Sequence, residues 1–169
     1  LKLPGKHNVE NAIAAMSVAY YLGATINQIM KAVSSFSGVK RRFDKYQYGN
    51  YIYIDDYAHH PKEIEVTLKA IKKLYPNKKM SVVFQPHLYS RTLNLADDFA
   101  YALSIADEIM LLDIYPAREK KIKGVTSEFL AKKIKVSKKS IETKKTVLNK
   151  IKNQKRDLLI TLGAGDIDE

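Results

Sequence analysis

Two aspartates and two histidines fall within one short segment, DDYAHHPKE at residues 55–63. Carboxylates and imidazoles this close together suit a metal site, an acid–base pair or a loop that grips a nucleotide. The adjacent His59 and His60 point to opposite faces of a strand, or about 100° apart on a helical turn, so they do not chelate as histidines at i and i+4 do. A helix cap before Pro61 would account for only one of the four side chains.

The segment FQPHLYSRT at residues 84–92 places His87 and Arg91 directly after a stretch typical of a buried strand. A guanidinium in that position can hold a carboxylate or a phosphate through two parallel hydrogen bonds. The alternative is a surface arginine that pairs with Asp97 or Asp98 in the following helix. Spacing alone leaves both interpretations open.

Two further segments carry residue types suited to phosphate. GVKRRFD at residues 38–44 contains Lys40, Arg41 and Arg42, and basic residues at a hinge can bind phosphates when two domains close, although linker charges are the commoner case. LGAGD at residues 162–166 has a G-x-G pattern, but it follows the last predicted strand rather than the first, so we interpret it as a tight turn. The sequence contains no G-x-x-x-x-G-K-[ST] motif, which excludes a P-loop in this chain.

The first part of the chain is predicted to be helical. Apolar residues recur at helical spacing over residues 8–22, and Gly23 is a suitable stop. TINQ at residues 25–28 is a capping box, which predicts a second helix that ends near Phe36. These two helices have no sheet of their own, so we place a boundary near residues 38–42.

Strands and helices alternate after that boundary. Gly49 and Asn50 separate two runs of aromatic and β-branched residues, which predicts a hairpin. Pro61 is well placed in the first turn of a helix that runs to about Leu74. Further strands are predicted at MSVVFQP, EIMLLDIY, near Ile141 and at RDLLITLGAGD, with helices at residues 93–105, 127–134 and 147–152.

This alternation predicts an α/β fold, with a mostly parallel sheet covered by helices on both faces and a short helical segment before it. In such sheets ligands bind beyond the carboxyl ends of the strands. Four polar segments lie at those ends, namely DDYAHHP, QPHLYSRT, DIYPARE and GAGD. We therefore expect them to converge on one rim of the sheet.

The charge of the chain is unevenly distributed. The net charge is +11, and residues 120–156 alone hold 13 lysines and one arginine against two glutamates. These lysines alternate with apolar residues and lack aromatic neighbours beyond Phe129, so we interpret them as a solvated surface and keep a nucleic-acid-binding module as the alternative. The absence of cysteine excludes disulfides and thiolate metal sites, and no run of about 18 apolar residues predicts a membrane span.

Taken together and in order, LPGKHNVENAIAA, GVKRRFD, DDYAHHPKEI, VVFQPHLYSRT and ITLGAGDI resemble the Mur ligases of peptidoglycan synthesis. The resemblance covers nearly the whole chain. It implies that residues 1–38 are the helical tail of a central ATP-binding domain. Residues 39–169 would then be a C-terminal, Rossmann-like domain that binds an amino acid.

The resemblance also implies an activity, which is ATP-dependent formation of an amide through an acyl phosphate. The motifs are most similar to those of the member that joins L-alanine to UDP-N-acetylmuramate, with a ligase that recycles a peptidoglycan tripeptide as the alternative. We expect ATP and Mg²⁺ as cofactors, the main Mg²⁺ ligands in the central domain and no metal ligand here. We also expect a cytoplasmic enzyme, contacts with its own central and N-terminal domains, no membrane or nucleic-acid partner, and no activity of this chain alone.

The resemblance assigns four residues to ATP. His7 and Asn8 match a pair that contacts adenine. Arg42 matches a hinge arginine that reaches the phosphates, and Asp56 matches an aspartate that bonds the ribose hydroxyls. Asp55 and His60 are then left to local structure.

The resemblance assigns the remaining candidates to the amino acid and the chemistry. His59 is the expected catalytic residue, at the end of the cleft where amino acid and phosphate meet. His87 and Arg91 match residues that hold the carboxylate of the incoming amino acid, and Tyr57 is expected to line the same cleft. Leu88 is a departure, because many members have a second arginine there, and it leaves Arg91 with more of that task.

Overall fold

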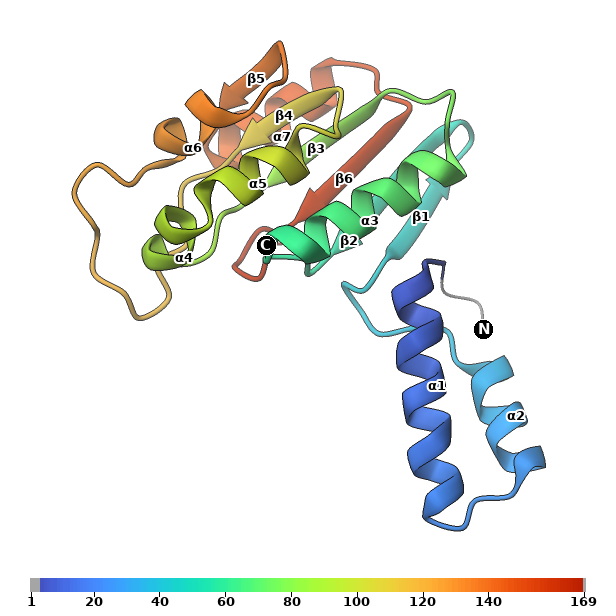
Figure 1. The fold of residues 1–169 in the computed structure, drawn as a ribbon. Coiled ribbons are helices and arrows are strands. Elements are labelled where there is room, and N and C mark those ends of the chain that lie inside the picture. The colour runs from blue at the N-terminus through green and yellow to red at the C-terminus, as the bar shows by residue number, and fades with distance from the viewer. Residues whose placement is uncertain (1–3, 169) are drawn as a thin grey trace.

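The computed structural model describes residues 4–168, apart from the side chain of His7. A pair of helices precedes an α/β domain and extends away from it, joined by a short linker (Figure 1). The pair consists of α1 (Lys6–Tyr21) and α2 (Ile26–Ser35). We refer to it as the helical lead, and it contributes no strand to the sheet.

The capping box predicted at the start of α2 is confirmed. Gln28 N donates to Thr25 Oγ1 at 3.3 Å, and Thr25 N donates to Gln28 Oε1 at 2.8 Å. Two otherwise unpaired N–H groups are thereby satisfied by residues three apart in the chain, which is why local sequence was enough to place this helix start.

The domain is built on one six-stranded sheet in the order β1-β2-β6-β3-β4-β5. Among the described strands, β1 and β2 alone pair antiparallel, as the predicted hairpin, and the other pairs are parallel. The strands are β1 (Asp44–Tyr48), β2 (Tyr51–Asp56), β3 (Met80–Phe84), β4 (Glu108–Leu111), β5 (Lys138–Ile141) and β6 (Leu158–Leu162).

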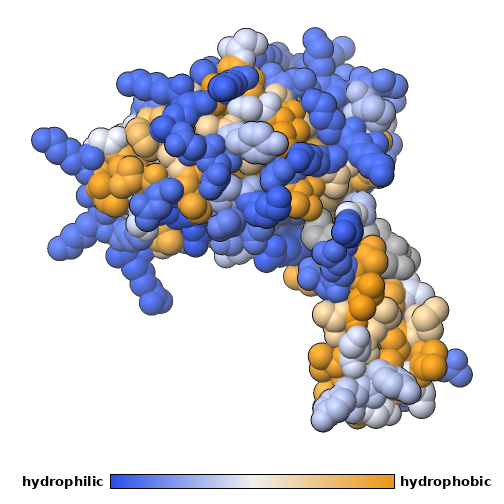
Figure 2. Space-filling view, in the orientation of Figure 1, coloured by the Kyte–Doolittle hydropathy of each residue, from blue (hydrophilic) through white to orange (hydrophobic). Residues whose placement is uncertain are grey.

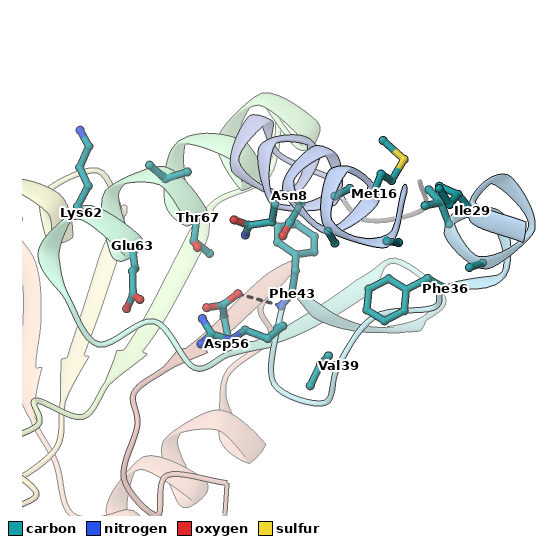
Figure 3. A pocket seen from close by; sticks show the side chains of 18 residues that line it. Asn8, Met16, Ile29, Phe36, Val39, Phe43, Asp56, Lys62, Glu63 and Thr67 are labelled. Carbon is teal, nitrogen blue, oxygen red and sulfur yellow. Dashed lines mark hydrogen bonds between the residues drawn. The ribbon is translucent and has the colours of Figure 1, made fainter. Parts of the chain in front are cut away.

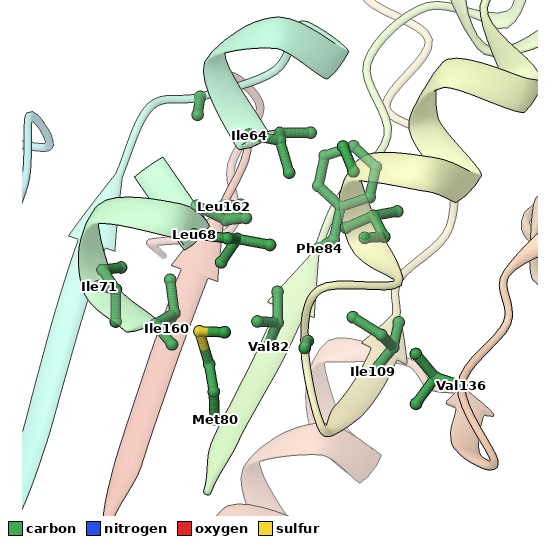
Figure 4. Packing of buried hydrophobic residues seen from close by; sticks show 14 of the residues in the cluster. Ile64, Leu68, Ile71, Met80, Val82, Phe84, Ile109, Val136, Ile160 and Leu162 are labelled. Atoms are coloured by element: carbon green, nitrogen blue, oxygen red, sulfur yellow. The ribbon is translucent and has the colours of Figure 1, made fainter. Parts of the chain in front are cut away.

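Helices cover both faces of the sheet, as predicted. One face packs against α3 (Pro61–Leu74), α5 (Ala96–Leu103) and α6 (Ser127–Lys133), and the other against α7 (Lys144–Asn153). Neighbouring strand residues point to opposite faces, so Val82 joins the larger core, shown in Figure 4, whereas Val83 joins the smaller core. Because both faces are covered, the inner strands β3, β4 and β6 are buried at every position and mostly apolar, whereas the edge strands β1 and β5 are polar and partly exposed.

The prediction of one continuous helix at residues 93–105 is wrong, because the helical segment begins earlier and is divided in two. The chain forms α4 (Tyr89–Asn94) and then α5, with a break at Leu95. The start of α4 is capped by Glu119, whose carboxylate accepts from Ser90 N at 2.9 Å. A cap supplied from so far along the chain leaves no signal in the local sequence.

Candidate active site

The loops after β2, β6, β3 and β4 meet at one edge of the sheet, because these strands are neighbours and run parallel. The convergence of four polar segments is therefore confirmed. Beside this edge, a cleft of about 910 Å³ lies between the helical lead and the domain (Figure 3). Its walls come from α1, α2, the linker, the end of β2 and the first turns of α3.

Asp56 lies at the inner end of this cleft and is only 6% exposed. Its two carboxylate oxygens accept from Phe43 N and Ala58 N, both at 2.8 Å, and Figure 3 marks the first of these bonds. Burial raises the pKa of Asp56 and outweighs the opposing effects of these bonds and of the Arg42 charge. Asp56 therefore fastens the linker to the end of β2.

Two more of the residues expected to bind ATP, Arg42 and Asn8, line the same cleft. The exposed side chain of Arg42 has its guanidinium carbon 5.4 Å from the centre of the Tyr57 ring. Asn8 enters from α1, and its Nδ2 donates to Pro4 O at 2.7 Å. The side chain of His7 lies outside the described part of the structure, so its predicted role stays a prediction.

The sequence analysis missed Asn11, which lines the cleft beside Asn8. Residues three apart on a helix share a face, so the spacing of the two asparagines was a usable signal. Glu63 was also missed, although it lines the cleft from α3.

Glu63 fixes the loop that carries both histidines. Its Oε2 accepts from the backbone N–H groups of His59 and His60, each at 3.1 Å. Burial alone would raise the pKa of Glu63, but these bonds and the positive neighbours lower it. His60 in turn caps α3, because its Nδ1 accepts from Lys62 N at 3.3 Å, so its assignment to local structure is confirmed.

A second group of predicted residues forms a chain of aromatic rings at the same edge of the sheet. The ring of His59 lies 5.4 Å from that of Tyr57 and 5.9 Å from that of His87, and both contacts are edge-on. His87 also stacks on Tyr115 at 5.6 Å. The loops after β2, β3 and β4 are thus in direct contact, and Tyr115 is a member that sequence reasoning missed.

Three buried side-chain atoms in the described residues have no hydrogen-bond partner. They are Gln85 Oε1, His87 Nδ1 and Arg91 Nη1, all within the segment after β3. Buried polar groups are rarely left unpaired, so these three atoms mark this segment as a candidate for a polar partner, either a ligand or an ordered water. The guanidinium nitrogen is a donor suited to a carboxylate, and the two other atoms are potential acceptors.

The alternative that Arg91 pairs with the next helix is wrong for the described residues. Asp97 forms its ion pair with Lys133 at 2.8 Å, and neither Asp97 nor Asp98 pairs with Arg91. Burial and then the positive charge of Arg91 lower the pKa of His87, which favours the neutral imidazole near neutral pH. Ser90, the residue before Arg91, is held by Glu119, because Ser90 Oγ donates to Glu119 Oε1 at 2.5 Å.

The segment LGAGD forms a turn, as interpreted, and this turn lies against Tyr115 of the ring cluster and against Gln85. A Cβ added to Gly165 would lie 2.8 Å from Tyr115 Cγ and would also collide with the Gln85 amide. Gly163, with φ of 151°, would bring a Cβ within 2.9 Å of Gln85 O. Only glycine allows the backbone to approach this closely.

The described residues hold no group of three or more His, Asp or Glu side chains that could bind a metal ion. Within residues 4–168, the helices are too short or too polar to cross a membrane. Neither finding assigns a function by itself.

The fold and this edge define an α/β domain with a mainly apolar cleft, in which Asn8, Asp56 and Glu63 are among the few polar lining residues, and with an adjoining cluster of rings and charges at the carboxyl ends of its strands. The chain belongs to the Mur ligase family, because the model of the Mur ligase glutamate ligase domain matches residues 41–165.

Particular relatives are named as one enzyme of that family. The UDP-N-acetylmuramate–L-alanine ligase of Cytophaga hutchinsonii is 46% identical over 170 residues, covering 99% of this chain and 36% of the relative. The enzyme of the same name from Flavobacterium psychrophilum is 48% identical over 168 residues, covering 99% of this chain and 38% of the relative. The chain thus spans little more than a third of the curated relatives it matches.

Solved structures agree with this placement. UDP-N-acetylmuramate–alanine ligase from Thermotoga maritima superposes with a TM-score of 0.76 at 32% identity, over 99% of this chain and 36% of that one. A murein peptide ligase from Psychrobacter arcticus reaches a TM-score of 0.70 at 22% identity, over 99% of this chain and 36% of that one, and shows the shared fold alone.

Proposed function

We propose that this chain is the C-terminal part of an ATP-dependent ligase that joins L-alanine to UDP-N-acetylmuramate. One observation carries the proposal: residues expected to bind nucleotide and residues expected to bind the amino acid form two separate groups that meet at Asp56 and Tyr57. The names of relatives at 46% and 48% identity support the same reaction.

The proposed division of the chain assigns residues 1–38 to the central ATP-binding domain and residues 39–169 to the C-terminal domain. The helical lead supports it, because large apolar side chains remain exposed along it, as Figure 2 shows in orange. Ile13 is 52% exposed, Val18 59% and Met30 61%. We propose that the remainder of the central domain covers this surface.

The cleft suits the adenosine and phosphate parts of ATP. We propose that Asn8 and His7 contact adenine. The carboxylate of Asp56 has more lone pairs than its two hydrogen bonds use, so it can accept from the ribose hydroxyls. Arg42 supplies a cation at the mouth of the cleft for the phosphates. Mg²⁺ would offset phosphate charge, and we propose, as the family resemblance implies, that its main protein ligands lie in the central domain.

In the proposed reaction, an oxygen of the muramyl carboxylate attacks the γ-phosphorus of ATP, which gives an acyl phosphate and releases ADP. The neutral amine of L-alanine then attacks the acyl carbon, the C–O bond to phosphate breaks, and inorganic phosphate and a proton are released as the amide forms. The contribution of this domain is mainly to orient the reactants and to place charges near them.

Each residue of the ring cluster has a part in that scheme. Arg91 holds the alanine carboxylate through its unpaired Nη1, and neutral His87 lies beside it. Nδ1 of His59 lies 3.0 Å from Tyr57 O, so Nε2 is the ring nitrogen available to the reacting groups. Tyr57 lines the boundary between the two halves of the site. Because the reaction uses ATP and a UDP-linked sugar, we propose the cytoplasm as its location.

The test is phosphate release by the full-length protein with ATP, Mg²⁺ and UDP-N-acetylmuramate. L-alanine, glycine, L-serine and an L-Ala-D-Glu-containing tripeptide are compared as acceptors. Release that is strongest with L-alanine supports the proposal, whereas release only with the tripeptide makes the protein a recycling ligase. Turnover by residues 1–169 alone would contradict the proposed need for the rest of the central domain.

A further inference from the structure

Arg41 and Arg42 are adjacent, yet their side chains serve different parts of the molecule. Arg42 is exposed at the cleft, whereas the side chain of Arg41 is only 12% exposed. Arg41 has φ of 60° and Phe43 has φ of 56°, conformations that residues other than glycine seldom adopt. Two such residues in one linker persist only when the surroundings hold them in place.

The guanidinium of Arg41 joins two segments that are far apart in the chain. Its Nε pairs with Asp55 Oδ2 at 3.1 Å, and Nη1 pairs with Asp168 Oδ1 at 2.8 Å. Nη2 donates to Gly163 O at 2.7 Å, and Nη1 to Gly165 O at 3.2 Å. Every arm of the planar fork is therefore used, which a lysine could not reproduce.

Asp55 completes the arrangement from the side of the sheet. Its other oxygen accepts from Thr161 Oγ1 at 2.5 Å, and that hydroxyl lies 2.9 Å from Tyr53 OH. The carboxylate is thus compensated at both oxygens, although its side chain is only 8% exposed. A buried ion pair with its remaining hydrogen bonds satisfied is a rigid connection.

Backbone bonds on both sides of Arg42 complete the attachment. Tyr57 N donates to Arg41 O at 2.7 Å, and Phe43 N donates to Asp56 Oδ2 at 2.8 Å. Arg42 lies between these two anchored residues, so its Cα has little freedom. The direction of its side chain toward the cleft follows from this attachment.

We propose that Arg41 is a positioning residue, which clamps the linker to the end of β2 and to the glycine turn and thereby holds Arg42 at the nucleotide cleft. The proposal rests on the proposed function, because it gives Arg42 its ligand. Without the clamp, the linker relaxes from its left-handed conformations and Arg42 leaves the cleft.

The amino-acid half of the site has independent support. Gln85 Nε2 donates to Asp166 Oδ1 at 2.8 Å, and Lys144 pairs with Asp166 at 2.9 Å, so the glycine turn stays attached when Arg41 is removed. Loss of the clamp should therefore raise the KM for ATP much more than the KM for L-alanine. A general loss of folding would not separate the two constants.

The test uses steady-state kinetics of the full-length ligase. Removing Arg41 alone strands the Asp55 charge and could unfold the protein, so the main variant is Arg41→Ala with Asp55→Asn. Arg41→Lys is the conservative variant, and Lys79→Ala, at an exposed lysine just before β3 and so at the opposite end of the sheet, is the control. We expect the double variant to raise the KM for ATP about tenfold with the KM for L-alanine within about twofold, and Arg41→Lys to be intermediate.

An unchanged KM for ATP in a folded double variant, or equal increases for both substrates, would overturn the proposal. A wild-type protein without ATP-dependent turnover would instead contradict the proposed function. The clamp is then tested by hydrogen exchange at the amides of Phe43 and Tyr57. Faster exchange in the double variant than in Lys79→Ala supports the clamp, and equal exchange rules it out.

Discussion

The ring of His59, which follows β2, lies 5.9 Å from the ring of His87, which follows β3, and their planes meet at 67°. The two strands are not neighbours, because β6 lies between them. The loops must therefore meet above the end of β6, where the chain turns through Gly163 and Gly165. A Cβ at either glycine would collide with Gln85, and one at Gly165 also with Tyr115, so the turn has no room for side chains beside the proposed amino-acid half of the site.

Arg91→Ala in the full-length protein should lower kcat/KM for L-alanine about 100-fold, or ~2.7 kcal/mol, because a two-pronged contact to a carboxylate is lost. Arg91→Lys should recover part of this, and the KM for ATP should stay unchanged. Lys79→Ala, at an exposed position away from the site, is the control. A change below about threefold in Arg91→Ala would remove this residue from the amino-acid site.

Asp56→Asn should raise the KM for ATP, because the amide presents fewer acceptors to the ribose hydroxyls. Asp56→Ala should also lower the free energy of unfolding by about 1–3 kcal/mol for each unpaired N–H, those of Phe43 and Ala58. Urea unfolding and ATP titration measure the two effects separately. Asp157→Asn, at an exposed position just before β6 and so at the opposite end of the sheet, is the control. An Asp56→Ala protein with the wild-type KM for ATP would refute the ribose assignment.

His87 should make stability depend on pH below 6.5, the ordinary pKa of histidine. Its pKa in the folded protein is lowered, so its contribution is fully present above 6.5. As pH falls from 6.5 to the folded pKa, the unfolded chain takes up a proton that the folded one does not, and stability is lost. Tm measured across this range should fall more for wild type than for His87→Gln; identical slopes would contradict a partly buried, neutral imidazole.

Gly165→Ala should destabilise the protein by about 1–3 kcal/mol, because its Cβ has no space beside Tyr115 and Gln85. It should also raise the KM for L-alanine, because a displaced Tyr115 ring would shift the His87 ring that stacks on it. Gly49→Ala is the comparison, because nothing lies within 4 Å of its added Cβ and only the backbone conformation at φ of 58° resists it. If both variants lower stability yet leave that KM alone, the turn does not support the amino-acid site.

Much of the fold could be predicted because its signals are local. The capping box at Thr25, the hairpin at Gly49 and the helix from Pro61 each depend on residues within a few positions of one another. The start of α4 could not be predicted, because its cap comes from Glu119, 29 residues beyond Ser90. Tyr115 could not be predicted for the same reason, because it follows β4 and its contact is with His87, which follows β3.

By itself, the sequence determined the order of helices and strands, the polar segments at the strand ends and the family resemblance, because these depend on periodicity, turn residues and motif order. The tertiary structure alone decided which neighbours share a site. In the folded chain, Arg41 forms a buried ion pair with Asp55 and Arg42 lies at the cleft. Arg91 Nη1 is buried without a hydrogen-bond partner. Side-chain direction at a positive φ, and contacts between segments a hundred residues apart, are set by packing.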